Sequence, residues 1–125
     1  MKYIVEKQEK YTLIKPEESK LDATVSAQFK AVLVEMNAEG QQNFIIDLSG
    51  VKYIDSSGLS TILVANRLCF DANGVLILCS VSEHVMKLIK ISQLDSILEI
   101  LPTLHEAVEA VFMNELEKDF NREEN

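Results

Sequence analysis

Two short apolar runs constrain the fold of this chain more than any other feature of its sequence. They span residues 44–48 and 75–79, and turn-forming residues such as Ser49-Gly50 and Asn73-Gly74 bound them. Continuous apolar runs of this length are typical of strands that are buried on both faces of a sheet. We therefore predict that both runs are inner strands.

Apolar residues recur at helical spacing in the segments between and after these strands. Helices are expected from a cap at Asp22 through Asn37, from the serines at 56–57 to a stop at Asn73-Gly74, after the capping residue Ser82 and after Thr103. Glu106 follows Thr103 at the spacing of a capping box. The core-facing residues that this periodicity predicts are Val25, Phe29, Val32, Leu33 and Met36 in the first helix, Leu59, Ile62, Leu63, Asn66 and Phe70 in the second, Val85, Met86, Leu88 and Ile89 in the third, and Leu104, Ala107, Val108, Val111 and Phe112 in the fourth.

The alternation of strands and helices predicts an α/β fold. An opening hairpin over residues 3–5 and 11–14 and a last short strand over 97–101 complete a mixed sheet of about five strands, with about four helices packed against it in about two layers. We expect residues 1–125 to form a single domain. The residues from about 116 onward are polar and are expected to fray into solvent.

Composition narrows the possible partners and location. The chain has 12 basic and 20 acidic residues, a formal net charge of −8, and no basic patch, which argues against nucleic acid as a partner. Cys69 and Cys79 lie in apolar stretches without CxxC spacing and are expected to be reduced core residues. No apolar run is long enough to span a bilayer and the N-terminus lacks a signal-peptide core, so we expect a cytoplasmic protein.

The second predicted helix begins at two serines and a glycine, Ser56-Ser57-Gly58. The backbone N–H groups at a helix start lack partners within the helix, and serine hydroxyls commonly cap them. One hydroxyl suffices for a cap, so we expect the other to project, while Gly58 leaves room for a partner to approach the backbone. A phosphate placed here would face N–H groups and the positive end of the helix dipole.

Residues 47–59, which read Asp-Leu-Ser-Gly-Val-Lys-Tyr-Ile-Asp-Ser-Ser-Gly-Leu, closely resemble the signature of STAS domains, in particular of bacterial anti-sigma factor antagonists. The similarity is strong over residues 44–64 and architectural over the rest of the chain. It implies a STAS-like fold and a non-enzymatic, partner-switching regulator of transcription. Such a protein, when unphosphorylated, binds an anti-sigma factor with serine kinase activity and frees the sigma factor. The alternative functions are those of STAS subunits in stress-sensing assemblies or in lipid-transport complexes.

The resemblance also implies site residues. The family's kinase phosphorylates the second serine of the Asp-Ser-Ser-Gly segment, which is Ser57 here, and a phosphoserine phosphatase would reverse the reaction. An acidic residue near that serine matches Asp22 in Leu21-Asp22, although Ser19-Lys20 replaces the glycine that commonly precedes this pair. A phosphate adds roughly −1.5 to −2 charge, which would repel an acidic partner surface. The residues expected to bind the partner are Asp22, Asp55, Ser56 and Gly58, with Ser60, Thr61, Val64 and Arg67 on the exposed face of the second helix.

The sequence offers little support for an enzyme. The Gly-x-Ser-x-Gly elbow of serine hydrolases is absent. His84 and His105 lie at predicted helix starts, where a solvated or capping histidine is commoner than a catalytic one. Asp22, Asp47 and Asp55 could in principle gather a divalent cation. However, Asp47 follows a buried apolar run and Asp55 can instead cap a helix, so structural roles are favoured for both. We therefore expect no catalytic residue, no metal and no cofactor.

Overall fold

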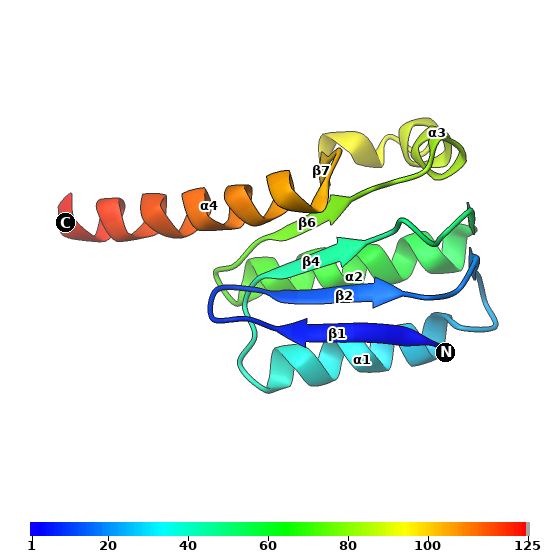
Figure 1. The fold of residues 1–125 in the computed structure, drawn as a ribbon, viewed down its shortest axis with the longest axis horizontal. Helices are drawn as coiled ribbons and strands as arrows, with labels where there is room; N and C mark the ends of the chain where they lie inside the picture. The colour runs from blue at the N-terminus through cyan, green and yellow to red at the C-terminus, as the bar shows by residue number, and fades with distance from the viewer. Residues whose placement is uncertain (125) are drawn as a thin grey trace.

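A five-stranded mixed sheet forms the centre of the molecule (Figure 1). The computed structural model describes residues 1–124. The strands are β1 (Tyr3–Lys7), β2 (Thr12–Pro16), β4 (Phe44–Asp47), β6 (Leu76–Cys79) and β7 (Glu99–Leu101), in the order β1-β2-β4-β6-β7. β1 pairs antiparallel with β2, and the other pairings in this sheet are parallel. The predicted hairpin, inner strands and mixed sheet are confirmed.

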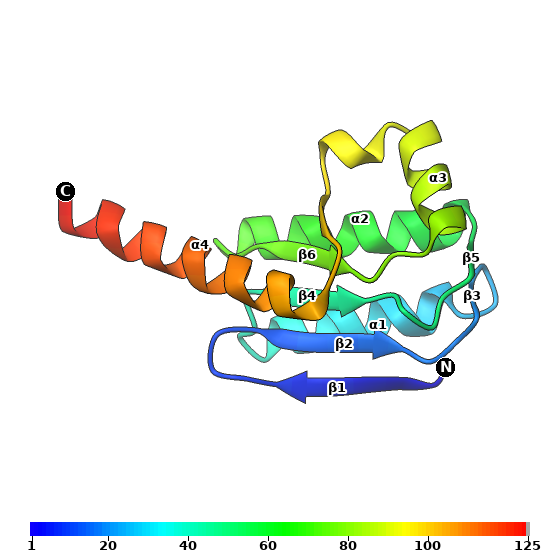
Figure 2. The ribbon, with the colours of Figure 1, turned by 45° about the horizontal axis from the view of Figure 1, so that its top comes forward.

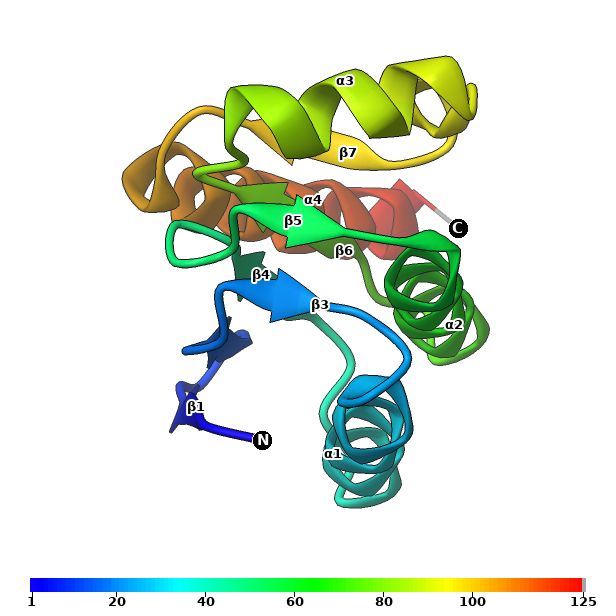
Figure 3. The same ribbon diagram turned by 90° about the vertical axis from the view of Figure 1, so that its right-hand side faces the viewer.

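Helices cover both faces of this sheet. α1 (Ser26–Ala38) and α2 (Ser56–Asp71) lie on one face, and α4 (Leu104–Glu124) lies on the other, as the end view in Figure 3 shows. The buried side chains of α3 (Glu83–Ile91) join the core on the side of α1 and α2. The fold therefore has three layers rather than the two predicted, because alternate strand residues place apolar side chains on both faces and each face needs cover.

Two hydrophobic cores result from this alternation. The core under α1 and α2 includes Ile14, Ile46 and Leu78 from the strands, and the core under α4 includes Leu13, Ile45 and Ile77 with Ala107 and Val111 from the helix. Cys69 lies in the first core and Cys79 in the second, and both are free thiols, as predicted. Burial raises the pKa of Cys69 to about 12 and that of Cys79 to about 11, so both thiols are protonated at neutral pH.

A second, two-stranded sheet was not predicted. β3 (Lys20–Leu21) pairs in parallel with β5 (Tyr53–Ile54), and these strands lead into the turn before α1 and into the start of α2. Strands of two residues carry no periodicity, so a sequence pattern cannot show them. The pair holds the approaches to α1 and α2 side by side at one end of the molecule (Figure 2).

The start of α1 differs from its prediction. The helix begins at Ser26 instead of Asp22. The Asp22 carboxylate accepts the backbone N–H of Thr24 (3.0 Å), and the Asp22 carbonyl accepts the N–H groups of Val25 (3.1 Å) and Ser26 (3.0 Å). These bonds form a turn that precedes the helix, as is common for an aspartate that bonds its own local backbone.

The core-facing side of α2 also differs from its prediction. Phe70 is 78% exposed, and the buried positions in the last turns are Ala65 and Cys69. α2 ends at Asp71, and the chain turns at Asn73, whose φ of 65° lies in the left-handed region that asparagine tolerates. The N–H of the next residue, Gly74, then donates to the Cys69 carbonyl (2.7 Å), which confirms the predicted helix stop.

The predicted Ser82 and Thr103 caps of the last two helices are confirmed, whereas the return contact of Glu106 is to the Thr103 hydroxyl (3.1 Å) instead of the backbone N–H used in a capping box. Ser82 Oγ accepts the N–H of Val85 (3.4 Å) at the start of α3, and Thr103 Oγ1 accepts the N–H of Glu106 (3.2 Å) at the start of α4. A short 3-10 helix at Leu94–Ser96 precedes β7. Within residues 1–124, no helix is both long and apolar enough to cross a membrane.

α4 is longer than predicted. It is helical through Glu124, although fraying was expected from about residue 116. Its first turns pack on the sheet through Ala107 and Val111, and the rest projects beyond the sheet (Figure 1). Phe112, a predicted core residue, is 46% exposed. Asn43 anchors the projecting part, because its Nδ2 donates to Glu115 Oε1 (2.8 Å).

Candidate functional site

The start of α2 is capped by Asp55. Its side chain follows β5 and accepts the backbone N–H groups of Ser57 (2.9 Å) and Gly58 (3.1 Å) through Oδ1. The predicted serine cap is therefore wrong, because the residue before the serines already fills that role. Two of the N–H groups that were expected to be open to a phosphate are occupied by the same carboxylate.

The Ser57 hydroxyl is held in place on both sides. It donates to Asp55 Oδ1 (2.5 Å), and its oxygen lies 3.0 Å from the Oγ of Ser26 on α1. The single proton of the Ser26 hydroxyl can be donated either to the Ser57 oxygen or to the Asp22 carbonyl, which lies 2.6 Å away. Ser57 is half-buried, whereas Ser56 is exposed. Ser57 is thus the serine with a fixed hydroxyl orientation.

Hydrogen bonds to Asp55 keep its carboxyl group ionised. The Ser57 hydroxyl and the Gly58 N–H lower the pKa of Asp55 below its ordinary range, and the N–H groups of Ser57 and Ala23 contribute in the same direction against a smaller desolvation effect. A charged carboxylate therefore lies against the Ser57 oxygen at neutral pH. This carboxylate holds the Ser57 hydroxyl proton on its own side, so both lone pairs of the Ser57 oxygen face away from Asp55, toward Ser26 or an incoming group.

The three aspartates considered for a cation have separate structural roles. Asp55 caps α2, Asp22 forms the turn before α1, and Asp47 Oδ1 accepts the N–H of Ser49 (2.9 Å) at the end of β4. Among the residues that the structure describes, no group of three or more His, Cys, Asp or Glu side chains is placed to hold a metal ion. The Asp22 carbonyl is linked to the Ser57 region through the Ser26 hydroxyl.

Gly58 has a packing role rather than the predicted role of opening the backbone to a partner. The residue is buried. A Cβ atom at Gly58 would lie 2.3 Å from the Leu21 carbonyl oxygen and 2.6 Å from Ile54 Cγ1. The glycine therefore allows α2 to begin in close contact with the β3–β5 pair.

The predicted partner-binding face of α2 is only partly exposed. Ser60 and Arg67 are exposed and Val64 is half-buried. Thr61 is only 4% exposed, and its Oγ1 donates to the Ser57 carbonyl (3.1 Å). Thr61 was wrongly assigned to this face, since it stabilises the first turn of α2 instead.

Sequence reasoning missed three residues around the site. Ser26 contacts Ser57, although the two residues are 31 positions apart in the sequence. Ser26 lies inside the first expected helix, and no local pattern there indicates a contact with Ser57. Tyr53, which is 43% exposed, stacks on His84 at the start of α3, with ring centroids 6.2 Å apart and an interplanar angle of 22°. This pair adds an aromatic surface beside β5, and only the tertiary structure shows it.

Comparisons with known proteins agree on one family. The model of the STAS domain family matches residues 3–107. The candidate anti-sigma factor antagonist BtrV of Bordetella bronchiseptica is 30% identical over 89 residues, which cover 71% of this chain and 76% of BtrV. The crystal structure of a candidate anti-sigma factor antagonist from Thermotoga maritima has 27% identity and a TM-score of 0.81, and covers 87% of this chain and 93% of that one.

The phosphorylated form of the Bacillus cell fate determinant SpoIIAA has the same fold. It superimposes with a TM-score of 0.69 at 22% identity, over 88% of this chain and 99% of SpoIIAA. At that level of identity the similarity concerns the fold alone.

Proposed function

This chain belongs to the STAS domain family, and we propose that it is an anti-sigma factor antagonist that is switched by phosphorylation of Ser57. In its unphosphorylated form it binds an anti-sigma factor with serine kinase activity and so frees a sigma factor. A phosphoserine phosphatase restores the binding form. This role needs no catalytic residue in the chain itself and places the protein in the cytoplasm.

The observation that carries this proposal is the fixed hydroxyl of Ser57 at the start of α2. Asp55 and Ser26 orient its oxygen from two sides, at 2.5 Å and 3.0 Å. A kinase that transfers a phosphoryl group needs its acceptor oxygen in a defined position. The names of BtrV and of the Thermotoga maritima protein, both candidate anti-sigma factor antagonists, support the same function.

The same contacts explain how a phosphate would switch binding. A phosphoserine carries roughly −1.5 to −2 charge near pH 7. At Ser57 it would lie beside the Asp55 carboxylate, which already occupies the N–H groups of Ser57 and Gly58. The repulsion between these charges would turn the phosphate toward solvent, beside the exposed Ser56 and Ser60. A partner surface that fits the neutral hydroxyl would then meet a bulky dianion.

The test is phosphate transfer by the partner kinase. Wild type, Ser56→Ala and Ser57→Ala are incubated with the anti-sigma factor and ATP, and the phosphate is located by mass spectrometry. We expect one phosphate, on Ser57, in the wild type and in Ser56→Ala, and none in Ser57→Ala. Transfer to Ser56, or to neither serine, would show that Ser57 is not the switch.

Binding is measured in parallel. Ser57→Ala should bind the anti-sigma factor about as well as wild type, while Ser57→Asp and the phosphorylated protein should bind more weakly. Ser92→Ala is the matched control, because Ser92 is an exposed serine at the end of α3 and is not among the expected partner-binding residues. If the chain instead captured a lipid-transporter ATPase or a stress-sensing assembly and no anti-sigma factor, the proposed function would be wrong.

A further inference from the structure

The outer face of α4 carries an apolar stripe that no part of the described chain covers. The stripe consists of Phe112, Met113, Leu116 and Phe120, which are 46%, 56%, 62% and 60% exposed. Three of these residues are four positions apart, so they lie on one helical face, opposite the face that packs on the sheet through Ala107 and Val111. The match to the STAS family model ends at residue 107, so the stripe lies outside the part of the chain that defines the family.

We propose that this stripe docks into an apolar groove of a partner protein whose rim carries lysine and arginine side chains. An amphipathic helix that lays its apolar face into a hydrophobic groove is a common mode of recognition, with anchor residues at spacings of three and four. The proposal goes beyond the anti-sigma role and does not rest on it.

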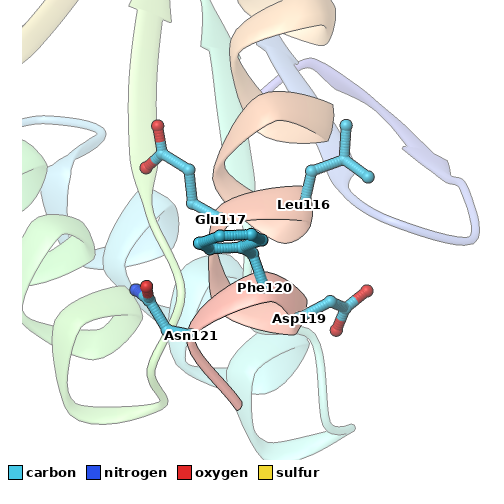
Figure 4. Close-up of a pocket in the computed structure, with 5 residues that line it drawn as sticks. All are labelled: Leu116, Glu117, Asp119, Phe120 and Asn121. Carbon is cyan, nitrogen blue, oxygen red and sulfur yellow. The ribbon is translucent and has the colours of Figure 1, made fainter. Parts of the chain in front are cut away.

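The charges beside the stripe identify the chemistry of the groove. Glu117 and Asp119 point away on opposite sides of the Phe120 ring (Figure 4). The nearest lysine on the helix, Lys118, is on the side of the sheet, where its Nζ lies 3.1 Å from Glu115 Oε1. The rim that a partner would meet is therefore acidic, and a basic rim on the partner would complement it.

The size of the stripe and its charge argue against a second copy of the chain as the occupant. Large side chains present roughly 150–250 Å² each, so the exposed parts of these four amount to about 450 Å². A stable interface needs about 800 Å² from each partner, and two such stripes facing each other would not reach it. They would also bring like charges together, because each copy carries a formal charge of −8. A groove that encloses the helix covers more of its surface and avoids this repulsion.

The position of the stripe makes it independent of the proposed switch. α2 begins at the end of the molecule that carries β3 and β5, whereas α4 projects from the opposite end (Figures 1 and 2). A partner on the stripe can therefore bind both the phosphorylated and the unphosphorylated protein.

Site-specific photocrosslinking in the protein's own cells tests the proposal. The photoreactive amino acid p-benzoylphenylalanine replaces Leu116 in the full chain, and the crosslinked peptides are identified by mass spectrometry. The same replacement of Val34, an exposed apolar residue on α1, is the matched control. We expect an adduct from position 116 alone, mapped to an apolar groove that has lysine or arginine side chains at its rim.

Charge reversal then tests the recognition itself. Glu117→Lys and Asp119→Lys should each lower the crosslink yield about tenfold, whereas Glu35→Lys on α1 should leave it unchanged. Ser57→Asp should also leave it unchanged, so failure of this proposal and failure of the proposed function are distinguishable. The proposal would be overturned if position 116 gave no adduct, or gave adducts only with a second copy of the chain or with lipid. It would also be overturned if the adduct lay on an acidic or polar surface, or if neither charge reversal changed the crosslink yield.

Discussion

Replacement of Gly58 by alanine tests the close contact that positions Ser57. In an ordinary helix, alanine in place of glycine stabilises by up to about 1 kcal/mol. Here the added Cβ would lie 2.3 Å from the Leu21 carbonyl oxygen and 2.6 Å from Ile54 Cγ1. Because the first of these atoms belongs to the backbone of β3, the contact cannot be relieved by a side-chain rotation. The structure therefore predicts the opposite sign, a loss of stability.

The magnitude follows from two opposing effects. Overpacking of this kind costs about 1–3 kcal/mol. Contacts of 2.3 and 2.6 Å place the cost in the upper part of that range, about 2–3 kcal/mol. The helix-propensity gain of alanine, up to about 1 kcal/mol, then leaves a net loss of about 1–2 kcal/mol. For a chain of this length each kcal/mol corresponds to a fall in Tm of about 3–5 °C. Gly58→Ala should accordingly melt about 3–10 °C below wild type.

Urea unfolding followed by far-ultraviolet circular dichroism measures this difference. The matched control is Gly50→Ala, because a Cβ at Gly50 makes only an ordinary contact, 3.5 Å from the Pro16 carbonyl oxygen. We expect Gly50→Ala to lie within about 0.5 kcal/mol of wild type. A Gly58→Ala protein as stable as wild type, or more stable, would refute the close approach of α2 to β3.

Two further predictions concern single hydrogen-bonding side chains. The pKa of Asp55 is lowered in the folded protein from its ordinary value of 3.8. The charged carboxylate therefore stabilises the fold fully above pH 3.8, and this stabilisation is lost as the pH falls through the folded pKa. Urea unfolding midpoints of wild type and Asp55→Asn, measured from about pH 6 to about pH 2, should therefore differ by a constant amount until the lowest pH values, where the difference shrinks. A difference that stays constant over the whole range would contradict the lowered pKa of Asp55. Asn43, which is 3% exposed, bonds the Lys10 carbonyl, Glu115 Oε1 and the Val75 N–H at 2.8 Å each. Asn43→Ala should therefore lower the free energy of unfolding in urea by about 2–4 kcal/mol. Glu115→Gln keeps an acceptor for Asn43 and should lower it by about 1 kcal/mol or less. Equal losses would show that the bonds of Asn43 to Lys10 and Val75 contribute nothing.

The sequence predicted those parts of the fold whose signals are local and repeated. The runs at residues 44–48 and 75–79 are short, β-rich and bounded by turn residues, which favoured inner strands. The helix after Ser56 followed from periodicity and from the turn at Asn73-Gly74. Phe70 was misplaced because the predicted face of α2 lies one position, or about 100° of rotation, from the face that contains Cys69. Apolar residues occur on both of these sides of the helix, so the pattern did not decide between them.

The details of the site depend on contacts between distant segments, which no local pattern contains. Three consecutive residues, Asp55, Ser56 and Ser57, can each cap a helix, and the choice depends on where the backbone turns after β5. β5 itself exists only because it pairs with β3, more than 30 residues earlier. The same pairing brings Ser26 to Ser57 and makes Gly58 necessary.

The order of strands in the main sheet repeats their order in the chain, and this has a consequence for synthesis on the ribosome. Each strand adds to the edge left by the strand before it, so none must insert between partners that are already paired. Such a sheet can grow as the chain emerges, with its N-terminal hairpin first. The face that carries Leu13, Ile45 and Ile77, however, is covered only by α4, which follows all of these strands in the chain. Between the synthesis of β6 and that of α4 this face is apolar and uncovered, so the nascent chain is most prone to aggregation in that interval.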